Sequence, residues 1–152
     1  MDIRAATEDE HELLVDHYLA LWDSYGTPAD HYRADARAQV HAFLAAGRRK
    51  RELGAFLAVE GEAVAGSAIC QLHISPYPEV IDPRHRLFGY ILSVFVDARF
   101  RRRGVGRRLM ASALAHLREL GCTTAVLHAS AAGEPLYEEL GFTPAREMRL
   151  AL

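Results

Sequence analysis

The sequence predicts an α/β fold, in one domain over residues 1–152, whose helices cover both faces of a mixed sheet. Three observations lead to this prediction. At Ala55 the helical spacing of apolar residues gives way to short apolar runs of the kind found in strands. Residues 88–96 are apolar almost throughout, as in a strand that is buried on both faces. Residues 105–120 then carry an apolar stripe of helical spacing, so strands and helices alternate in the second half of the chain.

Two helices are expected to follow a short first strand over residues 2–6. Thr7 and Glu10 fit a capping box, in which the Thr7 hydroxyl accepts the Glu10 N–H and the Glu10 carboxylate reaches back. The helix that they open should end at Gly26. A second helix is expected to begin near Asp30 and to stop at Gly47, because glycine often follows the last turn of a helix.

The middle of the chain predicts a β-hairpin, a loop and a buried strand. Apolar runs over residues 56–59 and 63–74 flank the turn at Gly61. Residues 75–83 contain three prolines, so they should form a surface loop without regular structure. Residues 88–96 then form the strand expected at the centre of the sheet.

The last third of the chain continues the alternation. A helix should open at Gly104 and end at Gly121, and a short buried strand should follow over residues 124–127. A shorter helix is expected to carry Leu136 and Leu140 and to stop at Gly141, before a final strand over residues 145–150.

The composition excludes several classes of protein. The formal net charge of −2 gives no general attraction to nucleic acid or to a membrane surface. No apolar stretch approaches the roughly 18 residues of a membrane span, and the N-terminus has no apolar leader, so we expect a cytoplasmic protein. Cys70 and Cys122 stand alone, which predicts buried thiols and neither a metal site nor a disulfide framework.

The chemistry is concentrated in the charged turn over residues 97–104 and the start of the helix that follows it. The free N–H groups of a helix's first turn and the helix dipole together bind anions, and Gly104 and Gly106 let phosphate oxygens approach the backbone. Each hydrogen bond to a charged group contributes roughly 1.5–3 kcal/mol, so three or four amides could hold a pyrophosphate. Guanidinium groups nearby would add charge, although an arginine-rich composition explains many of them equally well.

Other phosphate ligands fit this turn less well. A P-loop needs Lys and then Ser or Thr after its glycines, whereas Arg107 and Arg108 follow Gly106 here. The dinucleotide fingerprint needs a third glycine where Leu109 stands. A nucleic-acid patch is the remaining alternative, since residues 99–108 contain six arginines, but the chain is acidic overall and lacks interleaved aromatic residues beyond Phe100.

Two separated motifs resemble the GNAT family of N-acetyltransferases. The first is Val94-Phe95-Val96 followed by Arg101-x-x-Gly104-x-Gly106, and the second is Leu136-Tyr137-Glu138-Glu139-Leu140-Gly141-Phe142. The resemblance covers essentially the whole chain. It implies a splayed, mostly antiparallel sheet of six to seven strands with about four helices, and acetyl-CoA as the acetyl donor.

The resemblance also implies how the donor binds. Pantetheine would enter where the strand ending at Val96 diverges from the strand ending at Leu127, and the pyrophosphate would meet the amides of residues 102–107. Relatives often place an asparagine where Ser130 stands, so Ser130 either contacts the donor or caps a helix. The expected donor-binding residues are Val94, Phe95, Val96, Arg101, Arg102, Arg103, Gly104, Val105, Gly106, Arg107 and Ser130.

The implied reaction is direct attack of an amine on the thioester, without a covalent acyl-enzyme. The N–H of Val94 or Phe95 would stabilise the oxyanion, and Tyr137 occupies the family's position for the acid that protonates the leaving thiolate. Tyr137 could instead only pack its helix against the sheet, with its hydroxyl bound to the backbone.

The base that deprotonates the amine stays open. The candidates are His73, His128, Glu79 and a base acting through water, because Tyr90 stands where some relatives carry a glutamate.

The acceptor stays equally open, as the amine of a small molecule or a peptide. Residues 22–30 should contact it, and Asp23 and Asp30 could attract a cation or be ordinary solvated or capping residues. A monomer and a homodimer are equally compatible with the sequence. The competing functions are a non-catalytic acyl-CoA-binding or sensing module, against which Tyr137 argues, and an acyltransferase with another donor or acceptor.

Overall fold

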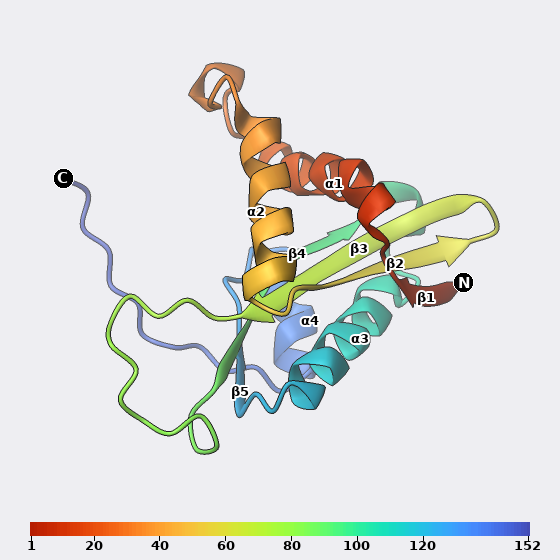
Figure 1. Ribbon diagram of the computed structural model, residues 1–152. Coiled ribbons are helices and arrows are strands. Elements are labelled where there is room, and N and C mark those ends of the chain that lie inside the picture. The colour runs from red at the N-terminus through yellow and green to blue at the C-terminus, as the bar shows by residue number, and fades with distance from the viewer.

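Five strands form one mixed sheet in the order β1-β2-β3-β4-β5 (Figure 1). The structure is a computed structural model and describes all residues, 1–152. Neighbouring strands run antiparallel, except that β4 and β5 are parallel. The strands are β1 (Asp2–Ala5), β2 (Gly54–Glu60), β3 (Ala63–Leu72), β4 (Phe88–Val96) and β5 (Thr124–Val126).

Helices cover both faces of the sheet, as predicted. In Figure 1, α1 (His11–Ser24) and α2 (Ala36–Lys50) lie on one face, and α3 (Val105–Glu119) and α4 (Glu134–Glu139) lie on the other. The buried Leu14 and Leu44 pack with Ile69 under α1 and α2, whereas Leu109 and Ile91 belong to the core beneath α3. Short 3-10 helices span Glu8–Glu10, Ala29–His31 and Ala98–Phe100. None of the helices combines the length and the apolar composition needed to cross a membrane.

The second helix differs from its prediction at both ends. Residues 29–31 form a separate 3-10 turn, so α2 begins at Ala36 and not near Asp30. It also continues through Gly47 to Lys50. Gly47 is a packing glycine rather than a helix end, because a Cβ there would lie 2.6 Å from Leu53 Cδ1. Gly26, in contrast, does end α1 with a φ of +76°, as predicted.

A β-bulge interrupts the pairing of β3 with β4. Ile69 is opposite Ser93 and Cys70 is opposite Ile91, so Leu92 is an extra residue in β4. An extra residue bends a strand and re-aims its neighbours. The bulge falls in the part of β4 that follows its pairing with β5.

The sheet splays between β4 and β5. Only Phe88–Tyr90 of β4 pairs with β5, in register with Thr124–Val126. Residues 91–96 of β4 therefore have β3 on one side and no strand on the other, which leaves an open row of peptide groups.

The final strand predicted over residues 145–150 is wrong, and the sheet has five strands instead of six to seven. Residues 142–152 form neither helix nor strand. The neighbouring β5 is only three residues long, so it offers a short edge for a further strand. Met148 and Leu150 are almost fully exposed in this segment.

Candidate active site

The turn between β4 and α3 is fixed to the sheet at its start. Asp97 Oδ1 accepts the backbone N–H of Arg99 at 2.9 Å and also binds its guanidinium. These hydrogen bonds hold the pKa of the Asp97 carboxyl down at about 2. Phe100 follows and is buried in the core beneath α3. The residues after Phe100 therefore extend from a backbone segment that is held in place against the sheet and the core.

The amides that follow are free to bind an anion. No backbone N–H from Arg102 to Arg107 makes a hydrogen bond of normal geometry within the chain. The first helical bond runs from the Arg108 N–H to the Gly104 carbonyl at 3.2 Å. Arg102 and Gly104 both have positive φ angles, of +62° and +75°, which turn this backbone toward one point. Because the positive end of the α3 dipole lies there too, the turn suits a phosphate group.

Most arginines of this turn have structural partners. Arg101 Nε donates to the Val96 carbonyl at 3.1 Å, and Arg103 pairs with Glu60 at 2.8 Å. Arg107 pairs with Glu139 of α4. Arg102 is the arginine of the expected donor-binding set whose side chain makes no hydrogen bond or ion pair within the chain. The anion site thus consists mainly of amides, with Arg102 as its free charge.

The second sequence motif lies directly against this turn. A Cβ on Gly106 would come within 3.0 Å of Leu136 Cδ2 and 3.9 Å of Val96 Cγ2, so α4 sits on the first turn of α3. The next residue of α4, Tyr137, packs its ring over Gly133 and edge-on to Phe142. Two motifs that are some thirty residues apart in the sequence therefore form one local structure.

Tyr137 is half-buried, and its hydroxyl makes no hydrogen bond within the chain. Burial raises the pKa of Tyr137, and the neighbouring Tyr25 raises it further. The phenol is therefore protonated at neutral pH and free to donate its proton.

Ser130 caps the turn that leads into α4. Its Oγ accepts the Gly133 N–H at 3.2 Å, and its carbonyl accepts the Gly133 and Glu134 N–H groups. Ser130 also lines the large cavity described below. The helix-capping role is thus part of the structure, and the hydroxyl hydrogen is left for an acceptor at the cavity.

The side chains at the end of β4 point away from the splay. Phe95 stacks on His17 of α1, with ring centroids 4.3 Å apart, and His17 Nδ1 lies 2.9 Å from Ser67 Oγ. Val94 and Val96 pack against the core beneath α3. A ligand in the splay would therefore meet the backbone of β4 rather than these side chains.

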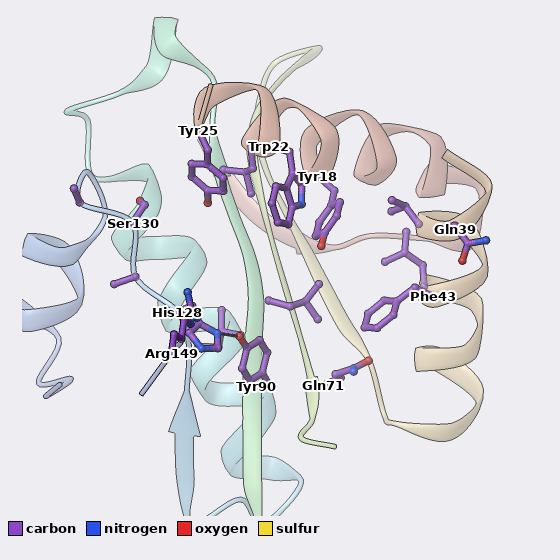
Figure 2. A pocket seen from close by; sticks show the side chains of 17 residues that line it. Tyr18, Trp22, Tyr25, Gln39, Phe43, Gln71, Tyr90, His128, Ser130 and Arg149 are labelled. Atoms are coloured by element: carbon purple, nitrogen blue, oxygen red, sulfur yellow. Dashed lines mark hydrogen bonds between the residues drawn. The ribbon is translucent and has the colours of Figure 1, made fainter. Parts of the chain in front are cut away.

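A cavity of about 970 Å³ lies between α1 and α2 on one side and β4 and the residues after β5 on the other (Figure 2). Aromatic side chains from both helices line it, and so do Tyr90, His128 and Ser130. Its most exposed rings are those of Trp22, Tyr25 and Phe43. The cavity thus joins the open edge of β4 to the helices that were expected to contact an acceptor.

Tyr90, His128 and Arg149 on one wall of this cavity are joined by hydrogen bonds through Glu147, which does not itself line the cavity. The Tyr90 hydroxyl and His128 Nδ1 point toward each other and form a hydrogen bond (Figure 2). His128 Nε2 lies 2.9 Å from Glu147 Oε2, and Arg149 Nε donates to the other oxygen of Glu147 at 2.6 Å. The hydrogen bond from His128 lowers the pKa of Glu147, and Arg149 lowers it further. An imidazole held between a phenol and a carboxylate can accept and pass on a proton.

The other proposed bases lie elsewhere. His73 packs against Phe88 and Tyr90, and its Nδ1 is buried without a partner outside the cavity wall. Glu79 accepts a hydrogen bond from Ser75 in the loop after β3.

The acidic residues considered for the acceptor do not line the cavity either. Asp23 accepts the Tyr32 hydroxyl at 2.8 Å, and Asp30 lies in the 3-10 turn over Ala29–His31. Both are solvated or structural residues. Sequence reasoning missed Glu147 and Arg149, because nothing in the local pattern ties the last residues of the chain to His128. Tyr18 and Trp22 have the helical spacing of apolar residues, and this spacing does not distinguish a cavity wall from a core.

Comparison with known proteins finds acetyltransferases that resemble this chain in sequence and in fold. The model described as "Acetyltransferase (GNAT) family" matches residues 12–142. N-alpha-acetyltransferase 30 from Xenopus laevis and from Homo sapiens are both 34% identical to this chain over 100 residues, or 62% of it. The match covers only 33% and 25% of the length of those two relatives.

Two solved structures resemble the whole chain. The GCN5-related N-acetyltransferase from Ralstonia eutropha JMP134 has a TM-score of 0.83 and 31% identity, with 99% of this chain and 97% of that chain covered. A predicted acetyltransferase from Clostridium acetobutylicum, solved with acetyl-CoA, has a TM-score of 0.82 and 18% identity, with 99% and 95% covered. The second likeness is one of fold.

Proposed function

The chain belongs to the acetyltransferase (GNAT) family, and we propose that it transfers an acetyl group from acetyl-CoA to the amine of a small molecule or peptide. One observation carries the proposal. The unbonded amides from Arg102 to Arg107 lie at the end of β4, where the sheet opens beside β5. An anion site next to an open strand edge suits a ligand that has both a pyrophosphate and an extended chain of amides, and acetyl-CoA has both.

The donor would follow the open edge of β4. The amides of pantetheine can pair with peptide groups near Val94 and Val96 in the manner of an added strand. The pyrophosphate then reaches the start of α3, where Gly104 and Gly106 leave the backbone accessible and Arg102 adds a charge. Arg101, Arg103 and Arg107 act mainly by holding the turn in place, Val105 contributes its backbone N–H, and Phe95 anchors β4 by stacking on His17.

The reaction requires three groups around the thioester. The free amine attacks the carbonyl carbon, so a C–N bond forms and the carbonyl oxygen becomes an oxyanion held by the N–H of Val94, since the register of β3 and β4 turns the Phe95 N–H toward β3. The C–S bond then breaks, and the leaving thiolate takes a proton from Tyr137. The second proton that the nitrogen loses as the amide forms restores the phenol. A base must first remove a proton from the acceptor ammonium.

The environment of Tyr137 supports its role as the acid. Its raised pKa keeps the phenol protonated, and no group of the chain competes for its proton. The sulfur would lie between Tyr137 and the end of β4, because α4 is seated on the turn that follows β4. Ser130, one turn before α4, is close enough to this region to bind the donor while it caps the helix.

We assign the base to His128. It lines the cavity where an acceptor would lie, and Tyr90 and Glu147 orient its two ring nitrogens. Tyr90 can carry the proton from the amine to His128, and Glu147 holds the imidazole from its other side. His73 and Glu79 do not line this cavity, so they have no comparable route to the amine.

The relatives support an acetyltransferase and leave the acceptor broad. The printed name of the Xenopus and human relatives, N-alpha-acetyltransferase, suggests the α-amine of a peptide as one acceptor. The Clostridium structure supports acetyl-CoA as the donor. The same fold also fits amines of small molecules, so both kinds belong in a test.

A screen for release of CoA thiol tests the proposal. The protein is incubated with acetyl-CoA and a panel of polyamines, aminoglycosides, amino acids and peptides with free N-termini, and mass spectrometry checks for the acetylated amine. Thiol release that requires both the amine and the protein, with matching acetylated product, is expected. Binding of acetyl-CoA without release for any amine would favour a non-catalytic acyl-CoA-binding module and overturn the enzyme assignment.

A further inference from the structure

The aromatic residues of the cavity are not part of the cores that hold the fold together. Trp22, Tyr25 and Phe43 line the cavity with 44%, 55% and 43% of their surface exposed. Neither hydrophobic core cluster includes them, nor Tyr18 from the same wall. Trp22 and Tyr25 pack edge to face at 5.9 Å, so the rings form a surface rather than scattered contacts. Aromatic side chains that line a cavity and do not pack in the core indicate a binding site for an apolar group.

The charges of the cavity disfavour a second cation in that ligand. No Asp or Glu lines the cavity, and Arg149 is the charged residue of its wall. The acidic residues on the outer side of α1 are already paired, since Glu12 and Asp16 both bind Arg37. A second ammonium group would thus lose water without gaining a carboxylate, which costs free energy.

His128 and the exposed rings of the two helices lie on opposite walls of the cavity. Tyr90 and His128 lie beside β4, whereas Trp22 and Phe43 project from α1 and α2 (Figure 2). Between them, Gln71 lines the cavity but is only 5% exposed, and its Oε1 is buried without a hydrogen-bond partner. The arrangement suits a molecule with its amine near His128 and an apolar group toward the helices.

We propose that the acceptor is a monoamine with a large apolar group, and that polyamines and aminoglycosides are poor acceptors. The proposal rests on the acetyltransferase function above and adds the chemical class of the acceptor. A cavity of about 970 Å³ has room for such a group. Free arylalkylamines and peptides that begin with a large apolar residue share this chemistry, and the experiment separates them.

The test compares kcat/KM for matched acceptors. Phenethylamine is set against ethylamine, a Phe-Ala dipeptide amide against a Gly-Ala dipeptide amide, and spermidine and kanamycin represent polycations. Burial of a phenyl ring should raise kcat/KM by about tenfold or more within at least one pair. An effect confined to the dipeptide pair identifies a peptide acceptor, and one confined to the phenethylamine pair identifies a free amine. Equal values within both pairs, or the highest value for spermidine or kanamycin, overturn the proposal.

Variants of the rings check that the cavity causes the preference. Within the pair that shows the preference, Trp22→Ala and Phe43→Ala should each reduce the ratio of kcat/KM for the phenyl-bearing acceptor to that for the small one by about tenfold, mainly through the KM of the phenyl-bearing acceptor. Tyr77→Ala is the control, because Tyr77 is also an exposed ring but lies in the loop after β3. Thermal stabilisation by acetyl-CoA verifies that each variant is folded. A ratio unchanged in both folded cavity variants overturns the proposal.

The experiments distinguish failure of the acetyltransferase function from failure of the proposed acceptor class. If no amine of either panel releases CoA, the acetyltransferase function fails. If CoA is released with polycations but not with apolar monoamines, that function stands and only the acceptor class fails.

Discussion

Leu136 Cδ2 lies 3.0 Å from the position that a Cβ would occupy on Gly106. This contact joins α4 to the first turn of α3, and it is reinforced by the ion pair between Arg107 and Glu139. Tyr137 follows Leu136 directly, so the same contact fixes the phenol relative to the amides proposed to hold the donor. The glycine of the first motif therefore also positions the proposed acid of the second.

Gly104 offers a test of the anion turn that separates binding from folding. Its φ of +75° is unfavourable for other residues, and a Cβ there would meet no atom within 4 Å. Gly104→Ala should lower the free energy of unfolding by about 1–2 kcal/mol and weaken acetyl-CoA binding about tenfold, because the methyl group stands where phosphate approaches. Urea unfolding and calorimetric titration measure the two effects.

Gly61→Ala is the matched control for that variant. Gly61 has a φ of +62° and equally open surroundings, but it lies in the hairpin turn between β2 and β3. It should lose similar stability and keep its affinity for acetyl-CoA. Equal affinity in both variants would contradict donor binding at Gly104.

Tyr137→Phe tests the proposed acid. Because the hydroxyl has no partner within the chain, its removal should leave the thermal midpoint unchanged. The value of kcat should fall about a hundredfold, the usual loss for a positioned acid. Tyr77→Phe, outside the cavity, should retain full activity. A kcat within about threefold of the unchanged protein would refute the acid role.

His128→Gln tests the proposed base. We expect kcat/KM to fall by about a hundredfold, because the variant has no imidazole to take the proton from the acceptor. Glu147→Gln should lose less, since it removes only the carboxylate that orients His128. The control is His31→Gln, at an exposed position in the turn before α2. A kcat/KM of His128→Gln within about threefold of the unchanged protein would point to a base acting through water.

The buried His17 should make the free energy of unfolding depend on pH. Its ring is 9% exposed, and burial lowers its pKa from the usual 6.5. The folded protein thus binds a proton on His17 less readily than the unfolded chain does. Its contribution to stability is complete above pH 6.5 and is lost as the pH falls below that value toward the folded pKa.

Urea unfolding at pH 8 and pH 5.5 measures this dependence. His17→Gln should reduce the loss of stability between the two pH values, whereas the exposed His31→Gln should not. An identical loss in His17→Gln and in the unchanged protein would show that other groups cause the dependence.

The sequence predicted best what local patterns determine. The bounds of β4 match the prediction at both ends, and the apolar stripe of α3 predicted that helix because the periods of strand and helix differ. Gly47 was misread as a helix end, since a glycine required by packing against Leu53 looks the same in sequence as a capping glycine. The prediction of a final strand failed because strand pairing depends on a neighbouring edge. The edge that β5 offers is only three residues long.

In the candidate site too, features formed by one contiguous segment could be predicted, and features that join distant residues could not. The anion turn could be predicted because its glycines and amides are contiguous in the chain. The contact of His128 with Glu147 depends on the path of residues that form no regular structure, and no spacing rule describes it. The cavity was missed because Tyr18 and Trp22 follow the same helical spacing as the buried Leu14.

The central claim is that the backbone amides at the start of α3 hold the donor. Titration of ¹⁵N-labelled protein with acetyl-CoA, followed by amide chemical shifts, tests it most directly. The account predicts that the largest shifts fall on Arg102 to Arg107 and on residues 91–96 of β4, with little change in the hairpin turn at Gly61. Saturable binding that shifts neither the amides of Arg102 to Arg107 nor those of β4 would contradict it.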